Sequence, residues 1–158
     1  VCIIWQNNTI IKILLPMKRL VELKVHLNNK FKNITFPIKI PNQILTVKTQ
    51  IILHLEGNYQ KFDLKNLYLG NLSKFAINVY YTLCYKTTAS HTITYKRLAQ
   101  LVDNPNSYRA VAQVLKYNPF PIIIPCHRVI GAKDLGGFSA PMGIKTKILL
   151  LRIEGALR

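Results

Sequence analysis

Apolar residues at the start of the chain form two short runs that predict a pair of antiparallel strands. The runs CIIW and TIIKILL, between Cys2 and Leu15, are rich in β-branched residues, and Gln6-Asn7-Asn8 separates them. Asparagine tolerates the positive φ that a tight hairpin turn requires. Pro16 has no N–H to donate and ends the second run. These residues predict a β-hairpin.

The pattern changes after the hairpin. Residues 18–36 show no clear period of apolar positions, and a proline interrupts residues 34–40, which predict at most an edge strand. Residues 42–55 place apolar side chains at helical spacing, and Gly57 is suited to end that helix. We expect this helix to cover the sheet. Residues 58–72 form a polar connector, and we place a domain boundary near its end.

Three segments beyond the connector also have helical spacing, at residues 74–83, 94–102 and 107–117. Thr94 and Ser107 are suited to cap the second and third helices, and Asp103-Asn104-Pro105 predicts a turn between them. Helix, short turn and helix form the outline of a helix-turn-helix, although many helical hairpins that bind no DNA share it.

The apolar run IIIPCHRVI, residues 122–130, predicts a short buried strand that Pro125 ends. Cys126 would then follow a rigid element. His127 and Arg128 flank the thiol, and a neighbouring positive charge favours the thiolate, so Cys126 is a candidate nucleophile. A buried structural cysteine explains the same residues.

The composition bounds the class of protein. The 158 residues suffice for one ordinary domain or two small ones. Lysine and arginine number 22 against 6 acidic residues, and the net charge of +16 favours a polyanionic partner or an anionic membrane surface. A generally basic, soluble surface explains the same charge. The sequence contains no apolar run of membrane-spanning length and no recognisable signal peptide, so we expect no membrane partner.

The cysteines indicate a reducing environment. Cys2, Cys84 and Cys126 are odd in number and far apart, without a C-x-x-C pair. This arrangement fits neither a disulfide framework nor a zinc site, so we expect no bound metal. We expect an intracellular location, in the cytoplasm or, in a eukaryote, the nucleus.

Three segments near the C-terminus form a specific pattern. They are NPFPIIIPCHRV at residues 118–129, LGGFS at residues 135–139 and LLRIEG at residues 150–155. Together they closely resemble the active-site region of the O6-alkylguanine-DNA alkyltransferases, also called methylated-DNA–protein-cysteine methyltransferases. Looser matches, HLEGNYQKFDL at residues 54–64 and FAINVY at residues 75–80, extend the resemblance to residues 42–158. Residues 1–41 are consistent with the variable N-terminal domain of that family.

The resemblance implies an α+β fold in two domains. Residues 1–70 would form a small RNase H-like domain of sheet and helix, and residues 71–158 a mainly helical, winged helix-turn-helix-like domain that binds DNA and carries the active site. The helix-turn-helix would occupy about residues 94–117, and the PCHRV motif would hold the acceptor. The resemblance implies no cofactor, and we expect a monomer.

The activity that the resemblance implies is DNA repair by direct damage reversal. Cys126 would accept a methyl or alkyl group from O6-alkylguanine in duplex DNA, irreversibly and once, after minor-groove binding and base flipping; O4-alkylthymine is a second candidate substrate. His127 would take the thiol proton through a water molecule, because adjacent side chains seldom face each other. Glu154 would orient that histidine, and Asn118 would brace the turn before the active site.

The same match assigns residues to the substrate pocket. The Tyr95 hydroxyl and the Ser139 backbone N–H would help the leaving guanine. Phe138 would form a pocket wall where many relatives have tyrosine. Val129 would contribute the pocket floor, although core packing explains it equally well, and Lys147 would lie near the pocket lip.

TYKRLA and YRAVAQVLKYNP also resemble segments of the family and assign residues to DNA binding. Tyr95 would crowd the phosphate on the 3′ side of the target nucleotide, and Arg109 would fill the hole left by the flipped base. Small residues such as Ala110 would let the recognition helix approach the minor groove. Lys96 and Asn104 complete the predicted DNA-binding residues.

Three other functions remain open. A non-catalytic relative could flip damaged bases and mark them for other repair systems, but such proteins lack the acceptor cysteine that is present here as Cys126. A helix-turn-helix regulator with an incidental thiol would bind a specific sequence and lose no thiol. A cysteine hydrolase would need a distant histidine, and His26, His54 and His91 lie in segments without such a signature.

Overall fold

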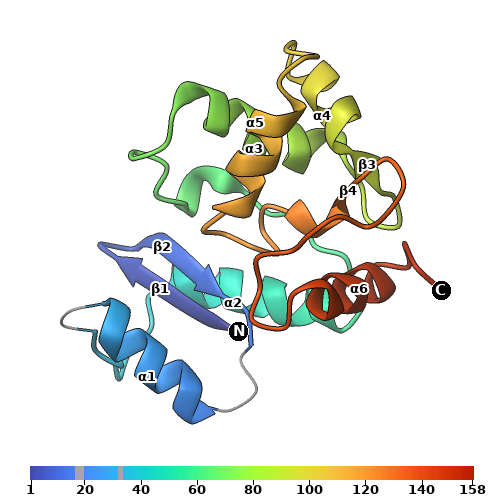
Figure 1. Ribbon diagram of the computed structural model, residues 1–158. Coiled ribbons are helices and arrows are strands. Elements are labelled where there is room, and N and C mark those ends of the chain that lie inside the picture. Colours follow the sequence, from blue (N-terminus) through green and yellow to red (C-terminus); the bar gives the residue numbers. More distant parts are fainter. Residues whose placement is uncertain (17–19, 32–33) are drawn as a thin grey trace.

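The computed structural model describes residues 1–16, 20–31 and 34–158 and shows a mixed α/β architecture with a small sheet and a mainly helical C-terminal part. One group of elements contains the hairpin and the helices α1 (Leu20–Lys30), α2 (Asn42–Leu55) and α6 (Ile144–Ile153) (Figure 1). The other contains α3 (Lys74–Lys86), α4 (Tyr95–Leu101) and α5 (Tyr108–Lys116). The orange segment before strand β4 (Val129–Ile130) lies between the two groups. This segment carries the predicted acceptor, so both groups are available to build the site.

The predicted hairpin is confirmed. Strand β1 (Cys2–Gln6) pairs antiparallel with β2 (Thr9–Leu14), with Gln6 opposite Thr9. Asn7 and Asn8 both adopt positive φ, at 48° and 62°, which is the geometry of a two-residue type I′ turn. The local residues alone therefore specify this element.

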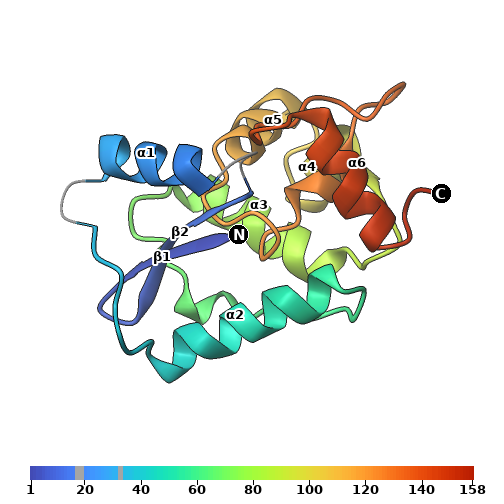
Figure 2. The same cartoon turned by 90° about the horizontal axis from the view of Figure 1, so that it is seen from below.

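The hairpin lies between two helices (Figure 2). Helix α2 (Asn42–Leu55), which was predicted, packs its buried residues with Ile10 and Ile13. Helix α1 (Leu20–Lys30) covers the other face, where Leu27 is buried with Ile4 and Leu14. The strands thus bury both faces.

In this region one helix was not predicted, and one predicted strand is wrong. Residues 18–36, of which 18–19 and 32–33 lie outside the described residues, have no clear apolar period that would predict an element, yet α1 forms there. Its stability comes from packing against the hairpin rather than from a wide apolar stripe. The edge strand expected in residues 34–40, all of which are described, does not form. Pro37 cannot donate to a strand partner, which is consistent with that absence.

The predicted helices of the C-terminal part are present. They are α3 (Lys74–Lys86), α4 (Tyr95–Leu101) and α5 (Tyr108–Lys116). The Thr94 side chain caps α4 by accepting the Arg97 N–H at 3.1 Å. Ser107 precedes α5 but donates its hydroxyl to the Asn104 carbonyl instead of capping the helix.

The remaining elements are short and lie near the predicted active site. Strand β3 (Ile93–Thr94) pairs parallel with β4 (Val129–Ile130), and the 3-10 helix η2 (Cys126–Arg128) precedes β4. A second 3-10 helix, η1 (Leu64–Asn66), joins the two parts, and α6 (Ile144–Ile153) ends next to the site.

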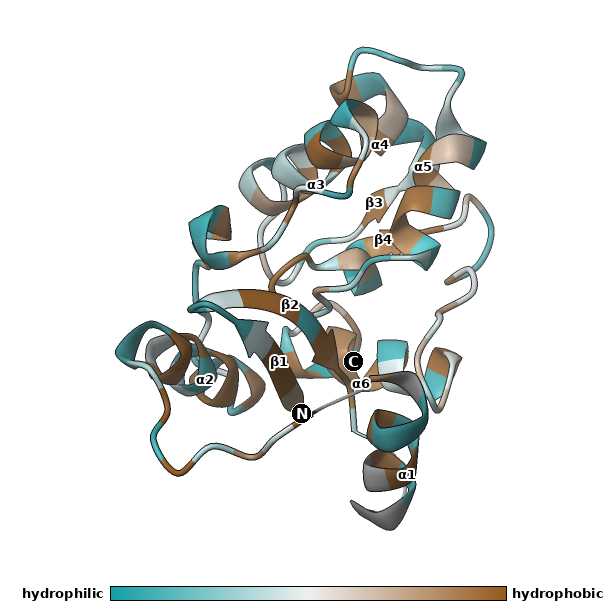
Figure 3. Ribbon diagram, turned by 90° about the vertical axis from the view of Figure 1, so that its left-hand side faces the viewer, coloured by the Kyte–Doolittle hydropathy of each residue, from teal (hydrophilic) through white to brown (hydrophobic). Residues whose placement is uncertain are grey.

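A single buried cluster runs through both groups of elements and includes Ile10, Ile51, Leu98 and Phe120. Figure 3 shows apolar residues mixed with polar ones around the helices, as expected for helices with one buried face. The Ile13 N–H also donates to the Pro119 carbonyl at 2.8 Å, so the hairpin is bonded to the chain just before the acceptor. The boundary near residue 70 stays a prediction. In the described part of the chain, no helix is long and apolar enough to cross a membrane.

The Tyr80 hydroxyl gives a test of the helical packing. It is buried and donates to the Val114 carbonyl at 3.0 Å, in the last turn of α5, where carbonyls lack helical partners. We expect Tyr80→Phe to lower the free energy of unfolding by about 1–2 kcal/mol, because a buried carbonyl loses its donor. Urea denaturation measures this change. The exposed neighbour Tyr81 is the control: an equal loss for Tyr81→Phe would contradict the assignment.

Candidate active site

Asn118 organises the turn that leads to the cysteine. Its Oδ1 accepts the Phe120 N–H at 2.9 Å, and its Nδ2 donates to the Ile124 carbonyl at 3.0 Å. The same Nδ2 lies 3.2 Å from Cys126 Sγ. One amide therefore joins the end of α5, the turn and the thiol, which is where the bracing residue was predicted.

Residues 122–124 form a tight turn rather than the predicted strand. Pro121 and Ile124 are bridged, and Ile122 has a φ of +77°, a left-handed conformation that is rare for a β-branched residue. Such a conformation costs on the order of 1–3 kcal/mol and persists only where the surroundings enforce it. Here all three isoleucines are buried and Asn118 fixes the backbone. Their β-propensity reflects a need for burial, which this turn also satisfies.

Cys126 is a buried thiol at rest. The residue is only 8% exposed. Burial raises the pKa of the thiol, and the Asn118 hydrogen bond and the Lys147 ammonium oppose this effect more weakly. We had expected the flanking His127 and Arg128 to favour the thiolate. Both side chains instead reach Glu154. A base must therefore take the thiol proton when attack occurs.

The Glu154 carboxylate, which follows α6, is the charged centre of the site. It is 1% exposed, and Arg128 binds both oxygens, with Nε 2.8 Å from Oε2 and Nη2 2.9 Å from Oε1. Burial alone would raise the pKa of Glu154, but the nearby imidazoles of His127 and His54 and the Arg128 guanidinium outweigh it and hold the pKa well below its ordinary value. Glu154 is thus a permanent anion.

His127 is placed to act as the base. Its Nε2 lies 2.9 Å from Glu154 Oε1, although the ring N–H does not point directly at that oxygen. Since a carboxylate repels a lone pair, we assign the proton to Nε2. Nδ1 is buried and has no hydrogen-bond partner among the described residues, so its lone pair can accept a proton. Burial lowers the pKa of His127, which keeps the ring neutral until it accepts one.

His54 is a site residue that the sequence analysis missed. It comes from α2, is 1% exposed, and its Nε2 lies 2.9 Å from Glu154 Oε1. The segment that carries it resembles the family, but no local pattern links residues 100 positions apart. The pairing of Arg128 with Glu154 was missed for the same reason. Among the described residues, no cluster of three or more His, Cys, Asp or Glu side chains is placed to hold a metal ion.

A cleft of about 290 Å3 opens onto Cys126 and brings together three predicted pocket residues, Tyr95, Phe138 and Ser139. A second cavity of about 530 Å3 reaches the same cysteine from the side of the hairpin and also includes Asn118. The thiol therefore lies where two hollows meet. Gly136, with a φ of +67°, lets the loop pass close to the Tyr95 ring.

Val129 and Lys147 lie elsewhere than predicted, since neither lines the two hollows. Val129 is fully buried and pairs with Ile93 between β3 and β4. Lys147 is also fully buried, and its Nζ donates to the Val129 carbonyl at 2.6 Å and to the Leu135 carbonyl. Burial lowers the pKa of Lys147 to about 8. Lys147 thus does not lie at the lip of the cleft, but binds backbone carbonyls beneath the loop beside it.

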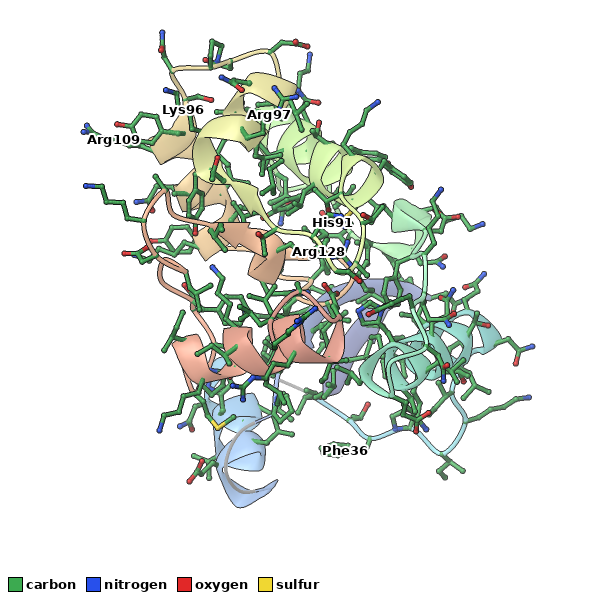
Figure 4. The ribbon with its side chains drawn as sticks, turned by 90° about the vertical axis from the view of Figure 1, so that its right-hand side faces the viewer. Phe36, His91, Lys96, Arg97, Arg109 and Arg128 are labelled. Atoms are coloured by element: carbon green, nitrogen blue, oxygen red, sulfur yellow. The ribbon has the colours of Figure 1, made fainter. Side chains whose placement is uncertain are left out.

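The predicted DNA-binding residues lie on α4, α5 and the turn between them. Tyr95 is half-buried at the start of α4, and the others are exposed: Lys96, Asn104, Arg109 and Ala110. Figure 4 shows Lys96, Arg97 and Arg109 at the end of the molecule opposite Phe36. The helix pair therefore presents a basic surface close to the cleft that holds Cys126.

The site combines a buried thiol, an adjacent histidine that pairs with a buried glutamate, and a basic helix pair that contributes to the same cleft. These features define a protein that can modify a nucleic acid through its cysteine. The family described as 6-O-methylguanine DNA methyltransferase, DNA binding domain, matches residues 74–156. The methylated-DNA–protein-cysteine methyltransferase of Methanosarcina mazei is 36% identical over 124 residues, covering 73% of this chain and 75% of that protein. The protein of the same name from Thermococcus kodakarensis is 33% identical over 139 residues, or 88% and 76% of the two chains. The chain belongs to the 6-O-methylguanine DNA methyltransferase family.

Solved structures agree with this assignment. The O6-methylguanine-DNA methyltransferase of the archaeon Pyrococcus kodakaraensis superposes with a TM-score of 0.68 at 29% identity, covering 97% of this chain and 89% of that one. Mycobacterium tuberculosis OGT, solved in complex with DNA, gives a TM-score of 0.60 at 32% identity over 68% and 63% of the two chains. Similarity thus extends over nearly the whole chain.

Replacing the buried carboxylate tests how much it contributes to the stability of the fold. We expect Glu154→Gln to lower the free energy of unfolding by about 3–5 kcal/mol near neutral pH, because Arg128 would keep a buried charge without its partner. Since the folded-state pKa of Glu154 is lowered, its contribution is complete above the unfolded-state pKa of about 4.3 and declines as the pH falls below it. Urea denaturation from pH 7 to pH 3 should show the gap between the two proteins narrowing at the acid end. A gap that does not depend on pH would contradict the assignment.

Proposed function

We propose that this protein repairs alkylated duplex DNA by direct damage reversal, transferring the methyl or alkyl group of O6-alkylguanine to Cys126. The transfer is irreversible and occurs once per chain. The observation that carries the proposal is a buried thiol that lines the cleft together with Tyr95 and Phe138 and is followed in sequence by His127, whose Nε2 lies 2.9 Å from Glu154 Oε1. Membership of the methyltransferase family supports the same reaction.

The chemistry follows from the geometry. Cys126 sulfur attacks the alkyl carbon in line with the C–O6 bond, so an S–C bond forms while the C–O6 bond breaks. The thiol proton passes through a water molecule to His127 Nδ1, and Glu154 stabilises the imidazolium that results. Hydrogen bonds from the Tyr95 hydroxyl and the Ser139 N–H stabilise the leaving guanine, which takes up a proton from solvent, while His127 returns the thiol proton to solvent. No cofactor takes part in these steps.

DNA binding delivers the damaged base to this cleft. A base inside a duplex cannot reach a buried thiol, so it must be flipped out. Helices α4 and α5 act as a helix-turn-helix with α5 at the minor groove; Tyr95 crowds the phosphate and Arg109 replaces the flipped base in the stack. Lys96, Asn104 and Ala110 complete the contact. The net charge of +16 favours phosphate binding along the rest of the surface.

The proposal also covers the fold of each domain, the oligomeric state and the cellular compartment. Residues 1–70 form an RNase H-like domain and residues 71–158 a winged helix-turn-helix-like domain. The protein acts as a monomer in a reducing intracellular compartment, because an oxidised acceptor could not attack. O4-alkylthymine, which presents a similar alkylated oxygen, is a second substrate.

Two variants test the division of labour between the thiol and the helix pair. We expect Cys126→Ala to abolish transfer while leaving the affinity for DNA within about twofold, since the thiol is not a phosphate contact. We expect Arg109→Ala to weaken binding to the damaged duplex by about tenfold. Fluorescence anisotropy reports binding, a 2-aminopurine beside the lesion reports flipping, and single-turnover assays report transfer.

Arg152→Ala is the matched control, because Arg152 is exposed on α6 and the charge lost is the same. If Arg152→Ala lowered the flipping signal as much as Arg109→Ala, Arg109 would have no special role. A Cys126→Ala protein that still removed methyl groups from DNA would contradict the mechanism. Sequence-specific binding to undamaged DNA without loss of the thiol would instead support a regulator.

A further inference from the structure

His54 is a buried histidine that the proposed reaction steps do not use. It lies at the end of α2, and its ring contacts those of Tyr59 and Phe62, with centres 6.1 Å and 5.6 Å away. Its Nε2 hydrogen-bonds Glu154 Oε1, the oxygen that also faces His127. A buried polar side chain in contact with the catalytic carboxylate can influence the reaction through it.

We propose that His54 is a positioning residue of the transfer reaction. It donates a hydrogen bond to one oxygen of Glu154 and so limits how strongly this carboxylate can stabilise the protonated form of His127. The inference relies on the proposed function, in which His127 is the base. It makes the N-terminal half of the chain a direct contributor to the chemistry of Cys126.

The hydrogen bonds of His54 define its protonation. The Gln60 backbone N–H donates to Nδ1 at 3.3 Å, so Nδ1 carries a lone pair and no proton. The ring proton then lies on Nε2 and is donated to Glu154. We assign this tautomer from the hydrogen-bond network, in which a backbone amide selects it. His54 therefore acts as a neutral donor.

His54 and His127 compete for the same oxygen. Both Nε2 atoms lie 2.9 Å from Glu154 Oε1, but only the N–H of His54 points at it. The titratable and charged groups that face the His127 ring are Glu154, which follows α6, Arg128 in η2, and His54 in α2. Burial lowers the pKa of His127, Glu154 opposes this effect, and the positive charge of Arg128 lowers the pKa further. Arg128 Nη2 also donates to Oε1, at 2.9 Å, so the guanidinium keeps the carboxylate in place, and removal of His54 leaves His127 as the other group that can donate to this oxygen.

The rate of transfer as a function of pH tests this competition. His127 can accept the thiol proton only while it is neutral, so the rate falls as the pH drops through its pKa. His54→Phe keeps an aromatic ring but removes the N–H donor. We expect the acid limb of the single-turnover rate to move to higher pH by about one unit, which is the shift expected when one charge-assisted hydrogen bond is lost. His54→Gln can place an amide donor near the Nε2 position, and we expect its profile to match that of the unmodified protein.

Phe62→Leu is the packing control, because it disturbs the contact with the His54 ring and leaves the donor in place. The proposal is overturned if His54→Phe leaves the profile unchanged, or if His54→Gln or Phe62→Leu shifts it equally. A purely structural histidine would change the fraction of active protein without moving the acid limb.

Nuclear magnetic resonance of the free protein tests the inference without transfer. We expect the His54 nitrogen signals of the unmodified protein to show a proton on Nε2 and a hydrogen-bonded lone pair on Nδ1. We expect His127 to titrate at higher pH in His54→Phe. A proton on His54 Nδ1, or an unchanged His127 titration, overturns the inference even if transfer to Cys126 occurs. Absence of transfer with both results as expected would overturn the proposed function alone.

Discussion

The carboxylate of Glu154 is the interaction on which the rest of the site depends. A buried anion costs several kcal/mol unless it is met by donors, and here donors arrive from distant segments: Arg128 and His127 from η2, and His54 from α2. Meeting that requirement brings α2, η2 and the end of α6 to one point. The same contacts orient the base behind the thiol, so the folding of the two halves and the geometry of the reaction share one cause.

The thiol itself is held in an unreactive form. Burial raises the pKa of Cys126, and its neighbours in sequence turn toward Glu154. The Asn118 amide and the strained turn at Ile122 instead fix the direction in which the sulfur points. An acceptor that can be used only once benefits from this arrangement, because a protonated, buried sulfur resists oxidation. Reactivity then depends on a base that lies close by and on DNA that delivers the alkyl group.

Elements specified by neighbouring residues could be predicted from the sequence, whereas those set by tertiary contacts could not. The Asn7-Asn8 turn and the Thr94 cap are local, and both were predicted. Helix α1 depends on packing against the hairpin, and the turn at Ile122 depends on Asn118, so apolar pattern alone misjudged both.

The site divides in the same way. The family motif led to Cys126, His127 and Glu154, which the structure brings together. The motif could not show that Lys147 points into the interior, or that His54 arrives from another helix, because spacing along the chain does not define the direction of a side chain. Intact-protein mass spectrometry after incubation with an O6-methylguanine duplex, followed by peptide mapping, tests the central claim most directly. The account predicts a gain of one methyl group, stopping at one per chain and located on Cys126; tight binding without any mass change, or a methyl group on another cysteine, would contradict it.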